Sequence, residues 1–400
     1  MFLQSTKNLF LLVLFYLFLS SCDFSHKTNK TTAKNLKKNL TPDFSQPSKK
    51  YLKEKREKLQ FFYDNYLGGD KFNGMFLVAK NGTVIFEKYN GFSNFNKEIK
   101  IGETTPLHLA SISKVATSLA ILRLVDKKLL LLDEDVRNFL PELPYEGISV
   151  RMLLNHRSGI PYYGYFSVNC WPKGKILRNR DLLLLLKKNK FPLNFKPDHK
   201  FAYSNTNFAL LALIIEKITN KQFPKAMQDL IFDPLKMTQS FIMDNTKNQE
   251  TVSQSYNSRM SKQEFTYLDN IYGDKNMYST VRDLLKMDVG TYSDNFLSAS
   301  SKKEMYKGYS YENTGMRNYG LGMRIVELKG KDSYFFHTGW WHGNRGCYAT
   351  LRADTVCIIA LTNTNSQSVY AIDRLSNVFG NYACENMIDS SLVFSTKKSK

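Results

Sequence analysis

The sequence predicts a mixed α/β (α+β) fold in which an antiparallel sheet, flanked by helices, is built from both ends of the chain. Three observations support this prediction. Residues 75–88 have the pattern of a strand hairpin, and residues 334–362 contain three more strand-like runs. Between these two stretches, apolar residues recur at helical spacing. We therefore expect a mostly helical region, roughly residues 125–275, to be inserted into the sheet domain.

The N-terminus is similar to a bacterial export signal. Lys7 supplies a positive charge, and Leu9–Leu19 is an unbroken apolar run of eleven residues. This run is too short to span a bilayer, which takes about 20 residues, but it suits a signal peptide. The run ends in Leu19-Ser20-Ser21-Cys22, which resembles the lipobox of bacterial lipoproteins. We expect residues 1–22 to be a lipoprotein signal peptide; a plain cleavable signal and an uncleaved anchor are the alternatives.

A lipobox implies lipid on Cys22, which becomes the new N-terminus after cleavage. The protein is then expected to be exported and anchored to a membrane of the bacterial cell envelope. Residues 23–58 are rich in Lys, Thr, Asn, Ser and Pro, and we expect them to form a flexible basic tether. The globular domain is expected over residues 59–388, followed by a loose tail at 389–400.

The chain is strongly basic, with a net charge of +20 over 400 residues. The first 58 residues carry +8 and the remaining 342 carry +12. A basic surface can attract nucleic acid, anionic lipid or an anionic cell wall. The sequence has no zinc-finger spacing and no basic run interleaved with aromatics, so we expect no nucleic-acid partner. It has no metal-ligand cluster and no phosphate-binding glycine loop, so we expect no cofactor.

The five cysteines are Cys22, Cys170, Cys347, Cys357 and Cys384. Their spacing matches no zinc pattern. An exported protein can form disulfides. Cys347 and Cys357 flank a predicted hairpin, and that position fits either a disulfide between them or two buried free thiols.

Each expected element follows from its own pattern. Residues 75–88 form two strands around Asn81-Gly82, a pair that favours a tight hairpin turn. Residues 114–124 have the apolar spacing of an amphipathic helix. The leucine-rich stretch 181–188, the stretch 208–218 ended by Thr219-Asn220, and the Ser/Thr-capped stretch 279–289 are further helices. The last third holds strands at 334–337, 347–352 and 356–362, then a closing helix from Ser366 to about Glu385.

Ser111 and Lys114 are the first candidates for catalysis. On a helix, side chains at positions i and i+3 lie on one face and can meet. A serine hydroxyl is a weak nucleophile and needs a nearby base. A lysine can serve as that base if burial or neighbouring positive charge destabilises its ammonium. The start of a helix also stabilises negative charge on an attacked carbonyl.

The Ser-x-x-Lys spacing is weak by itself. It also occurs at Ser300/Lys303 and Ser395/Lys398, both in lysine-rich stretches. Only the match at Ser111 follows a strand hairpin and opens an amphipathic helix with apolar neighbours on both sides. We therefore take Ser111 as the candidate nucleophile.

The stretch Leu109-Ala110-Ser111-Ile112-Ser113-Lys114 resembles the nucleophile motif of the family that holds class C β-lactamases, D-alanyl-D-alanine carboxypeptidases and related esterases. Further stretches agree with that family in the same order: 129–140, 153–161, Tyr203-Ser204-Asn205, 278–284, 319–323 and His337-Thr338-Gly339. Together they cover roughly residues 70–365. The resemblance implies a β-lactamase/transpeptidase-like fold and a serine hydrolase that forms an acyl-enzyme.

The resemblance also implies a role for each matched residue. Ser111 attacks the substrate carbonyl. Lys114 and Tyr203 form the base system, and Tyr203 also activates the water that releases the acyl group. Asn205 hydrogen-bonds the substrate amide. The oxyanion hole consists of the backbone N–H groups of Ser111 and Trp340.

The third motif departs from the pattern of many family members, which have Lys-Thr-Gly. Here it reads His337-Thr338-Gly339, and we expect these residues to bind the substrate. A lysine is a permanent positive charge that helps hold a substrate carboxylate, whereas a histidine is near its pKa at neutral pH. The change favours peptides, D-amino-acid amides or esters over β-lactams. His342 is equally a site residue or part of a cleft wall, and His156 is expected to be structural.

The leading functional hypothesis is an exported serine hydrolase that cleaves a cell-wall-type D-amino peptide, a β-lactam-like compound or an ester. A binding or sensor module on the same fold, acylated slowly or not at all, is the first alternative. A structural envelope lipoprotein is the second. The joint presence of Ser111, Lys114, Tyr203 and Asn205 favours the enzyme. The sequence predicts no oligomeric state.

Overall fold

The computed structural model describes residues 40, 42–244, 251–313 and 315–382. All of them fall within one unit of the chain, Asn39–Lys400. The expected signal peptide, Cys22, half of the expected tether (residues 23–39 and 41) and the tail at 389–400 therefore lie outside the described residues. No helix within the described residues is long and apolar enough to cross a membrane.

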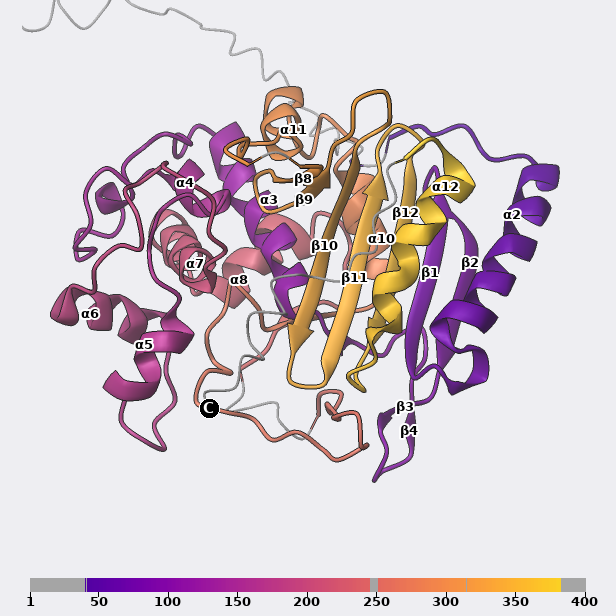
Figure 1. Ribbon diagram of the computed structural model, residues 1–400, viewed down its shortest axis with the longest axis horizontal. Helices are drawn as coiled ribbons and strands as arrows, with labels where there is room; N and C mark the ends of the chain where they lie inside the picture. The colour runs from indigo at the N-terminus through magenta and orange to yellow at the C-terminus, as the bar shows by residue number, and fades with distance from the viewer. Residues whose placement is uncertain (1–39, 41, 245–250, 314, 383–400) are drawn as a thin grey trace, which may run out of the picture. The chain divides into compact units, whose positions relative to one another are not determined.

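Both ends of the domain contribute to one seven-stranded sheet. Its order is β2-β1-β12-β11-β10-β9-β8, and all its neighbouring strands are antiparallel. Figure 1 shows the indigo strands β1 and β2 beside the yellow strand β12. The strands are β1 (Gly74–Lys80), β2 (Thr83–Asn90), β8 (Arg317–Tyr319), β9 (Arg324–Val326), β10 (Tyr334–Trp341), β11 (Asn344–Leu351) and β12 (Val356–Thr362). The predicted antiparallel sheet built from both ends of the chain is confirmed.

The β1–β2 hairpin has the turn that its sequence favours. Lys80 pairs with Thr83, which leaves Asn81 and Gly82 as a two-residue loop. Both have positive φ, 54° and 71°. This backbone matches a type I′ turn, in which Asn-Gly is preferred because both positions need left-handed conformations.

The sheet separates two hydrophobic cores. Alternate residues of β1 face opposite sides, so Met75 and Leu77 join one core while Phe76 and Val78 join the other. The second core is covered by α2 (Lys49–Phe62), by the 3₁₀ helix η6 (Gln367–Leu375) and by α12 (Ser376–Phe379). The first core is larger and extends into the inserted helices.

The inserted region is mostly helical, as predicted. The helices before, within and after it are α3 (Ser113–Asp126), α4 (Val150–Leu154), α5 (Tyr163–Cys170), α6 (Asn179–Asn189), α7 (Asn205–Thr219), α8 (Phe223–Met227), α10 (Val281–Gly290) and α11 (Ala299–Met305). Helices α6, α7 and α10 are those expected at 181–188, 208–218 and 279–289. The Oγ1 of Thr280 caps α10 by accepting a hydrogen bond from the Asp283 N–H at 3.2 Å.

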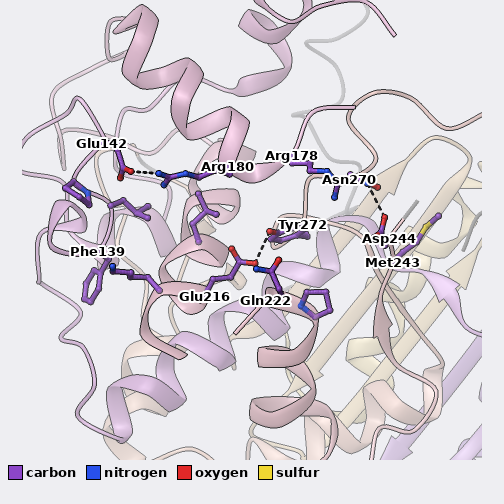
Figure 2. Close-up of a pocket in the computed structure, with 15 residues that line it drawn as sticks. Phe139, Glu142, Arg178, Arg180, Glu216, Gln222, Met243, Asp244, Asn270 and Tyr272 are labelled. Atoms are coloured by element: carbon purple, nitrogen blue, oxygen red, sulfur yellow. Dashed lines mark hydrogen bonds and ion pairs between the residues drawn. The ribbon is translucent and has the colours of Figure 1, made fainter. Parts of the chain in front are cut away.

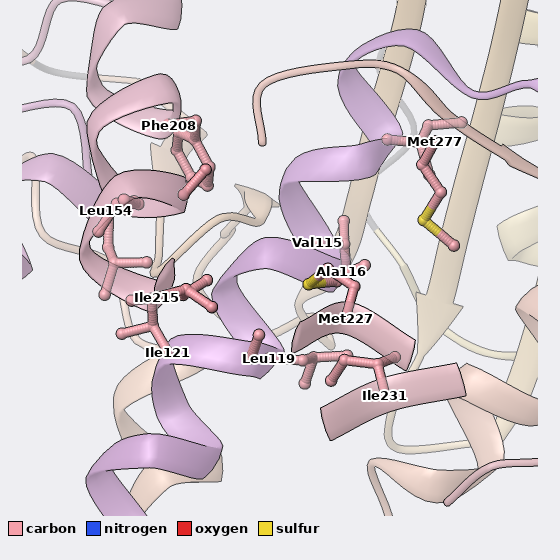
Figure 3. Close-up of a cluster of buried hydrophobic side chains, with 14 of the residues drawn as sticks. Val115, Ala116, Leu119, Ile121, Leu154, Phe208, Ile215, Met227, Ile231 and Met277 are labelled. Atoms are coloured by element: carbon pink, nitrogen blue, oxygen red, sulfur yellow. The ribbon is translucent and has the colours of Figure 1, made fainter. Parts of the chain in front are cut away.

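Helix α3 is held on all sides by apolar side chains. Every residue from Ser113 to Leu122 is buried, as expected for a helix inside a core rather than at its surface. Val115 and Leu119 belong to the same cluster as Ile215 of α7, Met227 of α8 and Ile231 (Figure 3). This packing holds the N-terminus of α3, with Lys114 in its first turn, in one position.

Short elements complete the domain, and the sequence pattern did not predict them. A small sheet has the order β5-β7-β6, and β3 pairs with β4. These strands are β3 (Phe92–Asn94), β4 (Ile99–Lys100), β5 (Leu107–His108), β6 (Phe241–Ile242) and β7 (Met277–Ser279). Single helical turns are η1 (Tyr63–Leu67), η2 (Gly69–Lys71), η3 (Ala110–Ile112), η4 (Val136–Asn138) and η5 (Gln228–Phe232). Each of these short strands has only two or three residues, which is too few to show an alternation of apolar and polar residues.

The structure differs from the expected tether at residues 49–58, which belong to α2. Ser48 caps this helix by accepting a hydrogen bond from the Tyr51 N–H at 3.2 Å. Leu59 and Phe62 at its end are buried in the second core, with the Phe62 and Phe76 ring centroids 5.9 Å apart. Only these two residues of the helix are fully buried, and most of the others are polar, which is why its composition resembled that of a linker.

The closing helix is also shorter than expected. Residues 367–375 form the 3₁₀ helix η6, and α12 then ends at Phe379, before Gly380. Residues 383–385, at the end of the expected helix, lie outside the described residues.

The disulfide alternative is wrong for Cys347 and Cys357. In the ladder between β11 and β12, Cys347 pairs with Ala360 and Cys357 pairs with Thr350. The two thiols point into the cores on opposite faces of the sheet. Both are free, as is the exposed Cys170.

Candidate active site

Ser111 lies in the helical turn η3, between β5 and α3. The residue before it, Ala110, has φ of 47°, a left-handed conformation that costs a residue with a Cβ about 1–2 kcal/mol. The Ala110 N–H donates to Nδ1 of His108 at 3.0 Å, which holds this conformation. Ala110 and Ile112 are buried, whereas Ser111 is partly exposed. The strained turn therefore presents the serine to the surface of a buried framework.

Lys114 meets Ser111 as the spacing predicts. Its Nζ lies 3.0 Å from the Ser111 Oγ and 2.8 Å from the carbonyl oxygen of Asp274. The lysine side chain is fully buried. Burial lowers the pKa of Lys114 to about 7, the Asp274 carboxylate opposes this effect, and the Arg324 guanidinium adds to it. A large share of Lys114 is therefore uncharged at neutral pH and able to accept a proton.

Tyr203 joins this pair from the segment that precedes α7. Its ring centroid is 5.1 Å from the Lys114 Nζ and 5.2 Å from the guanidinium carbon of Arg324. The ring of His156 packs against it with centroids 4.3 Å apart. The structure thus brings together Ser111, Lys114 and Tyr203, as the sequence analysis expected.

His156 supports Tyr203 from a buried position. Its Nδ1 accepts from the Ser204 N–H at 3.2 Å and lies 3.3 Å from the Asn207 Nδ2, which is also a donor. Nδ1 therefore carries no proton. Burial holds the pKa of His156 well below its usual value, with the charge of Lys114 as the next cause. The ring is a neutral wall of the site, which fits the structural role expected for it.

Asn205 offers an acceptor to a substrate. It is the first residue of α7, and its Oδ1 is buried without a hydrogen-bond partner among the described residues. A buried carbonyl oxygen without a partner is costly. A substrate N–H would satisfy it, in line with the role expected for Asn205.

His337 has a different place from the one expected. It is fully buried, and its Nδ1 lies 2.7 Å from the carbonyl oxygen of Thr338. Because that oxygen can only accept, Nδ1 carries the proton, and Nε2 accepts from the Tyr319 hydroxyl at 3.0 Å. Burial, followed by the charges of Arg324 and Lys114, holds the pKa of His337 well below its usual value. Both nitrogens are used inside the wall, so His337 is neutral and supports the site instead of binding the substrate.

Gly339 lets β10 approach the nucleophile turn. A Cβ at this position would lie 2.3 Å from the carbonyl oxygen of Leu109 and 3.2 Å from the Ala110 Cβ. Only glycine permits this approach. Thr338, beside it, is buried in the same strand.

The strand pairing around Trp340 indicates where its backbone N–H points. Trp341 and Asn344 close a two-residue hairpin, so they form a hydrogen-bonded pair. Alternation along the ladder then turns the Trp340 N–H away from β11. On that side, the described pairing with β9 covers only Tyr334–Phe336. The N–H is left at the strand edge, near the nucleophile turn.

The sequence analysis missed the charged loop that supports Lys114. Asp274 and Lys275 are both buried, with the Lys275 Nζ 3.6 Å from the Asp274 carboxylate. The Tyr163 hydroxyl donates to Asp274 at 2.6 Å and accepts from Lys275 at 2.8 Å. An adjacent Asp-Lys pair in a loop is usually solvated, so only the fold reveals that these charges are buried.

His342, in the turn between β10 and β11, contacts Asp269 of the same loop. Its Nε2 lies 3.0 Å and 3.1 Å from the two carboxylate oxygens of Asp269, and the Trp341 Nε1 donates to Asp269 at 2.5 Å. Burial raises the pKa of Asp269, but the hydrogen bond and charge of His342, together with hydrogen bonds from Trp341 and the Thr266 N–H, outweigh it and lower the pKa to about 2. Of the two positions considered for His342, the structure shows a wall residue tied to Asp269.

A cavity of about 670 Å³ lies elsewhere in the domain (Figure 2). Asn270 and Tyr272 of the same loop line it, and the Tyr272 hydroxyl donates to Glu216 at 2.9 Å. Ser111, Lys114 and Tyr203 are not among its lining residues.

In the part of the chain that the structure describes, no group of three or more His, Cys, Asp or Glu side chains is arranged to hold a metal ion.

Comparison with known proteins agrees with this geometry. The family model described as Beta-lactamase matches residues 62–379. Penicillin-binding protein 4* of Bacillus subtilis (strain 168) is 29% identical over 336 residues, which are 79% of this chain and 73% of that protein. The penicillin-binding protein of Bacillus halodurans has a solved structure with a TM-score of 0.71 and 23% identity, covering 79% of this chain and 98% of that one.

Two relatives from Staphylococcus aureus match shorter stretches. Protein flp (strain MRSA252) is 34% identical over 179 residues, which are 43% of this chain and 35% of that protein. Teichoic acid D-alanine hydrolase is 27% identical over 230 residues, which are 56% of this chain and 55% of that protein. The matched stretch spans less than two thirds of each of these two relatives.

Proposed function

The chain belongs to the Beta-lactamase family of serine hydrolases, and from this premise we propose that it hydrolyses an amide or ester bond through an acyl-enzyme on Ser111. One observation carries the proposal. The Nζ of a fully buried lysine, Lys114, lies 3.0 Å from the Ser111 Oγ, and burial lowers the pKa of this lysine to about 7. A serine next to a base that is half uncharged at neutral pH is an activated nucleophile.

In the proposed acylation step, the Ser111 Oγ attacks the substrate carbonyl while Lys114 takes its proton. The N–H groups of Ser111 and Trp340 stabilise the oxyanion. Tyr203 passes the proton to the leaving group. Asn205 orients the substrate through the unpaired Oδ1. In deacylation, Tyr203 and Lys114 take a proton from the water molecule that attacks the acyl carbonyl and return a proton to the Ser111 Oγ as the acyl–oxygen bond breaks.

The proposed substrate class is a D-amino-acyl amide or ester of the cell envelope. Two matched relatives are named a penicillin-binding protein and a teichoic acid D-alanine hydrolase. The neutral, buried His337 gives no charge to a substrate carboxylate from the third motif. This feature favours D-amino-acyl esters and amides over efficient β-lactam hydrolysis.

Export and anchoring through lipid on Cys22 are part of the same proposal. They rest on the apolar run Leu9–Leu19 followed by Ser20-Ser21-Cys22. In bacteria that express the full chain, we expect radiolabelled palmitate to enter the wild-type protein and Cys22→Ala to lose the label. Equal labelling of both proteins would contradict lipidation at Cys22.

The catalytic proposal is tested by active-site labelling of residues 23–400 with a fluorophosphonate and, separately, with penicillin. We expect a fluorophosphonate adduct on the Ser111 peptide, located by mass spectrometry, and none in Ser111→Ala. Ser300→Ala, at the other described Ser-x-x-Lys match, is the matched control and keeps the label. Folded protein without any adduct would leave the binding module as the better description. Penicillin labelling would make cell-wall peptides the leading substrates; without it, D-amino-acyl esters and amides lead.

A further inference from the structure

Arg324 occupies a position that the sequence analysis did not assign. It lies in β9 and pairs with Phe336 of β10 on one side and with Tyr319 of β8 on the other. Its guanidinium carbon is 5.2 Å from the Tyr203 ring centroid, and the Lys114 Nζ is 5.1 Å from the same centroid. The two cationic groups therefore lie within about 10 Å of each other, close enough to influence each other's protonation.

The third motif carries no positive charge, and Arg324 supplies one beside the base system. His337 is neutral and uses both ring nitrogens in hydrogen bonds to Tyr319 and Thr338. The charge of Lys275 is neutralised by Asp274, 3.6 Å away. An arginine keeps its charge at every pH at which a protein is folded. A fixed positive charge beside the base system thus comes from β9 and not from the third motif.

We propose that Arg324 is a positioning residue of the acylation step, whose fixed charge beside Tyr203 and Lys114 keeps this pair ready to accept the Ser111 proton. This inference rests on the proposed function. Positive charge disfavours protonated Lys114 and favours ionised Tyr203, so it acts on both bases in the same direction. Arg324 therefore has the electrostatic role of a third-motif lysine, and the neutral histidine is tolerated because of it.

The electrostatics at Lys114 agree with this role. The pKa of Lys114 is lowered first by burial, is raised by Asp274, and is lowered again by Arg324. At an effective dielectric constant of about 20, two like charges about 10 Å apart change each other's pKa by about one unit. Loss of the guanidinium is then expected to change the uncharged fraction of Lys114 about tenfold at pH below its pKa.

The other titratable groups around Lys114 are known, so the effect of Arg324 can be isolated. The charged groups are Asp274 and Lys275, in the loop before β7, and Arg324 in β9. The other titratable groups are Tyr203 before α7, His156 after α4, Tyr319 in β8 and His337 in β10. Burial keeps the pKa of both histidines well below 6.5 and the pKa of Tyr319 well above 10. These three groups stay neutral near pH 7, whereas Lys114 titrates there.

The test measures the second-order rate of fluorophosphonate labelling of Ser111 between pH 5.5 and 9.5. We compare the wild type with Arg324→Gln, Arg324→Lys and Lys329→Gln, where Lys329 is an exposed residue just beyond β9. We expect Arg324→Gln to be about tenfold slower near pH 6, with its acid midpoint raised by about one pH unit and its rate close to that of the wild type above pH 9. Arg324→Lys should keep the midpoint, because it keeps the charge. Lys329→Gln should match the wild type.

Each outcome decides between the two proposals. An Arg324→Gln enzyme that is labelled with the wild-type midpoint would overturn the inference and leave the proposed function intact. So would an equal loss of rate in Arg324→Gln and Arg324→Lys at every pH, because a purely structural role would produce it. Absence of labelling in the folded wild type would overturn the proposed function, and the role of Arg324 with it.

Discussion

At the residue scale, the site depends on the buried side chain of Lys114. A lysine that is buried, charged and only partly compensated destabilises a protein. The chain keeps Lys114 in the first turn of α3, where the only described hydrogen bonds of its Nζ go to Ser111 and to the Asp274 carbonyl. This arrangement lowers the pKa of Lys114 to about 7, which suits a general base and is unfavourable for the folded state.

Replacing Lys114 with methionine should therefore stabilise the fold while abolishing labelling of Ser111. The pKa is about 7 in the folded state and near 10.5 when unfolded, so between these values the unfolded chain binds more protons. Wild-type stability then rises with pH from 7 upward, by about 1.4 kcal/mol per pH unit. The stability advantage of Lys114→Met should be larger at pH 6 than at pH 9 by about 2–3 kcal/mol.

Urea unfolding of both proteins at pH 6 and pH 9 measures this difference. Lys329→Met, at an exposed site, is the control and should show no pH-dependent advantage. An advantage of Lys114→Met that is the same at both pH values would contradict a lowered pKa at Lys114.

At the element scale, α2 is a helix whose polar composition resembles that of a linker. Lys55 donates to the carbonyl oxygen of Val378 at 2.7 Å, and the Arg56 Nε donates to that of Ile85 at 2.9 Å. These long side chains satisfy backbone acceptors while Leu59 and Phe62 are buried. The helix is thus part of the folded domain, although most of its residues resemble those of a tether.

Limited proteolysis with trypsin distinguishes the helix from a tether. We expect protection at Lys55 and Arg56, because a protease needs an extended, unpaired segment. Phe62→Ala removes the main anchor, at a cost of about 3–5 kcal/mol, and should expose both sites. Early cleavage of the wild type after Lys55 or Arg56 would show that α2 does not pack as described.

At the scale of the whole molecule, the sheet divides the domain into two separate hydrophobic cores, one on each face. Cys347 and Cys357 lie on adjacent strands but on opposite faces. Burial raises the pKa of both thiols well above the usual value. The stability of this part of the protein therefore does not depend on a disulfide between these two residues, whatever the redox state of its compartment.

Alkylation with iodoacetamide tests this arrangement. Among the three described cysteines, we expect Cys170 to react first in the native protein and both sheet cysteines to be protected, because only thiolates at accessible positions react. All three should react after denaturation in urea, which is the control. A peptide that links Cys347 to Cys357 in an unreduced digest would contradict the opposite facing of these residues.

Much of the fold was predictable because it depends on local pattern. The turn at Asn81-Gly82, the strands at 347–352 and 356–362 and the helix at 208–218 each have a period or a turn residue that determines them. The α2 helix was missed because two buried residues over one end of a polar stretch produce no clear period. The short strand β5 was missed because two residues cannot show one.

The sequence by itself determined that Ser111 and Lys114 meet, since helical spacing fixes that contact within four residues. The ordered motifs also identified Tyr203, Asn205 and Gly339 before their geometry was visible. The tertiary structure alone decided the charge state of the site. Burial of Lys114, the neutral state of His337 and the approach of Arg324 depend on segments up to 223 residues apart. A pKa is set by what surrounds a group in space, and those surroundings exist only after the sheet has closed.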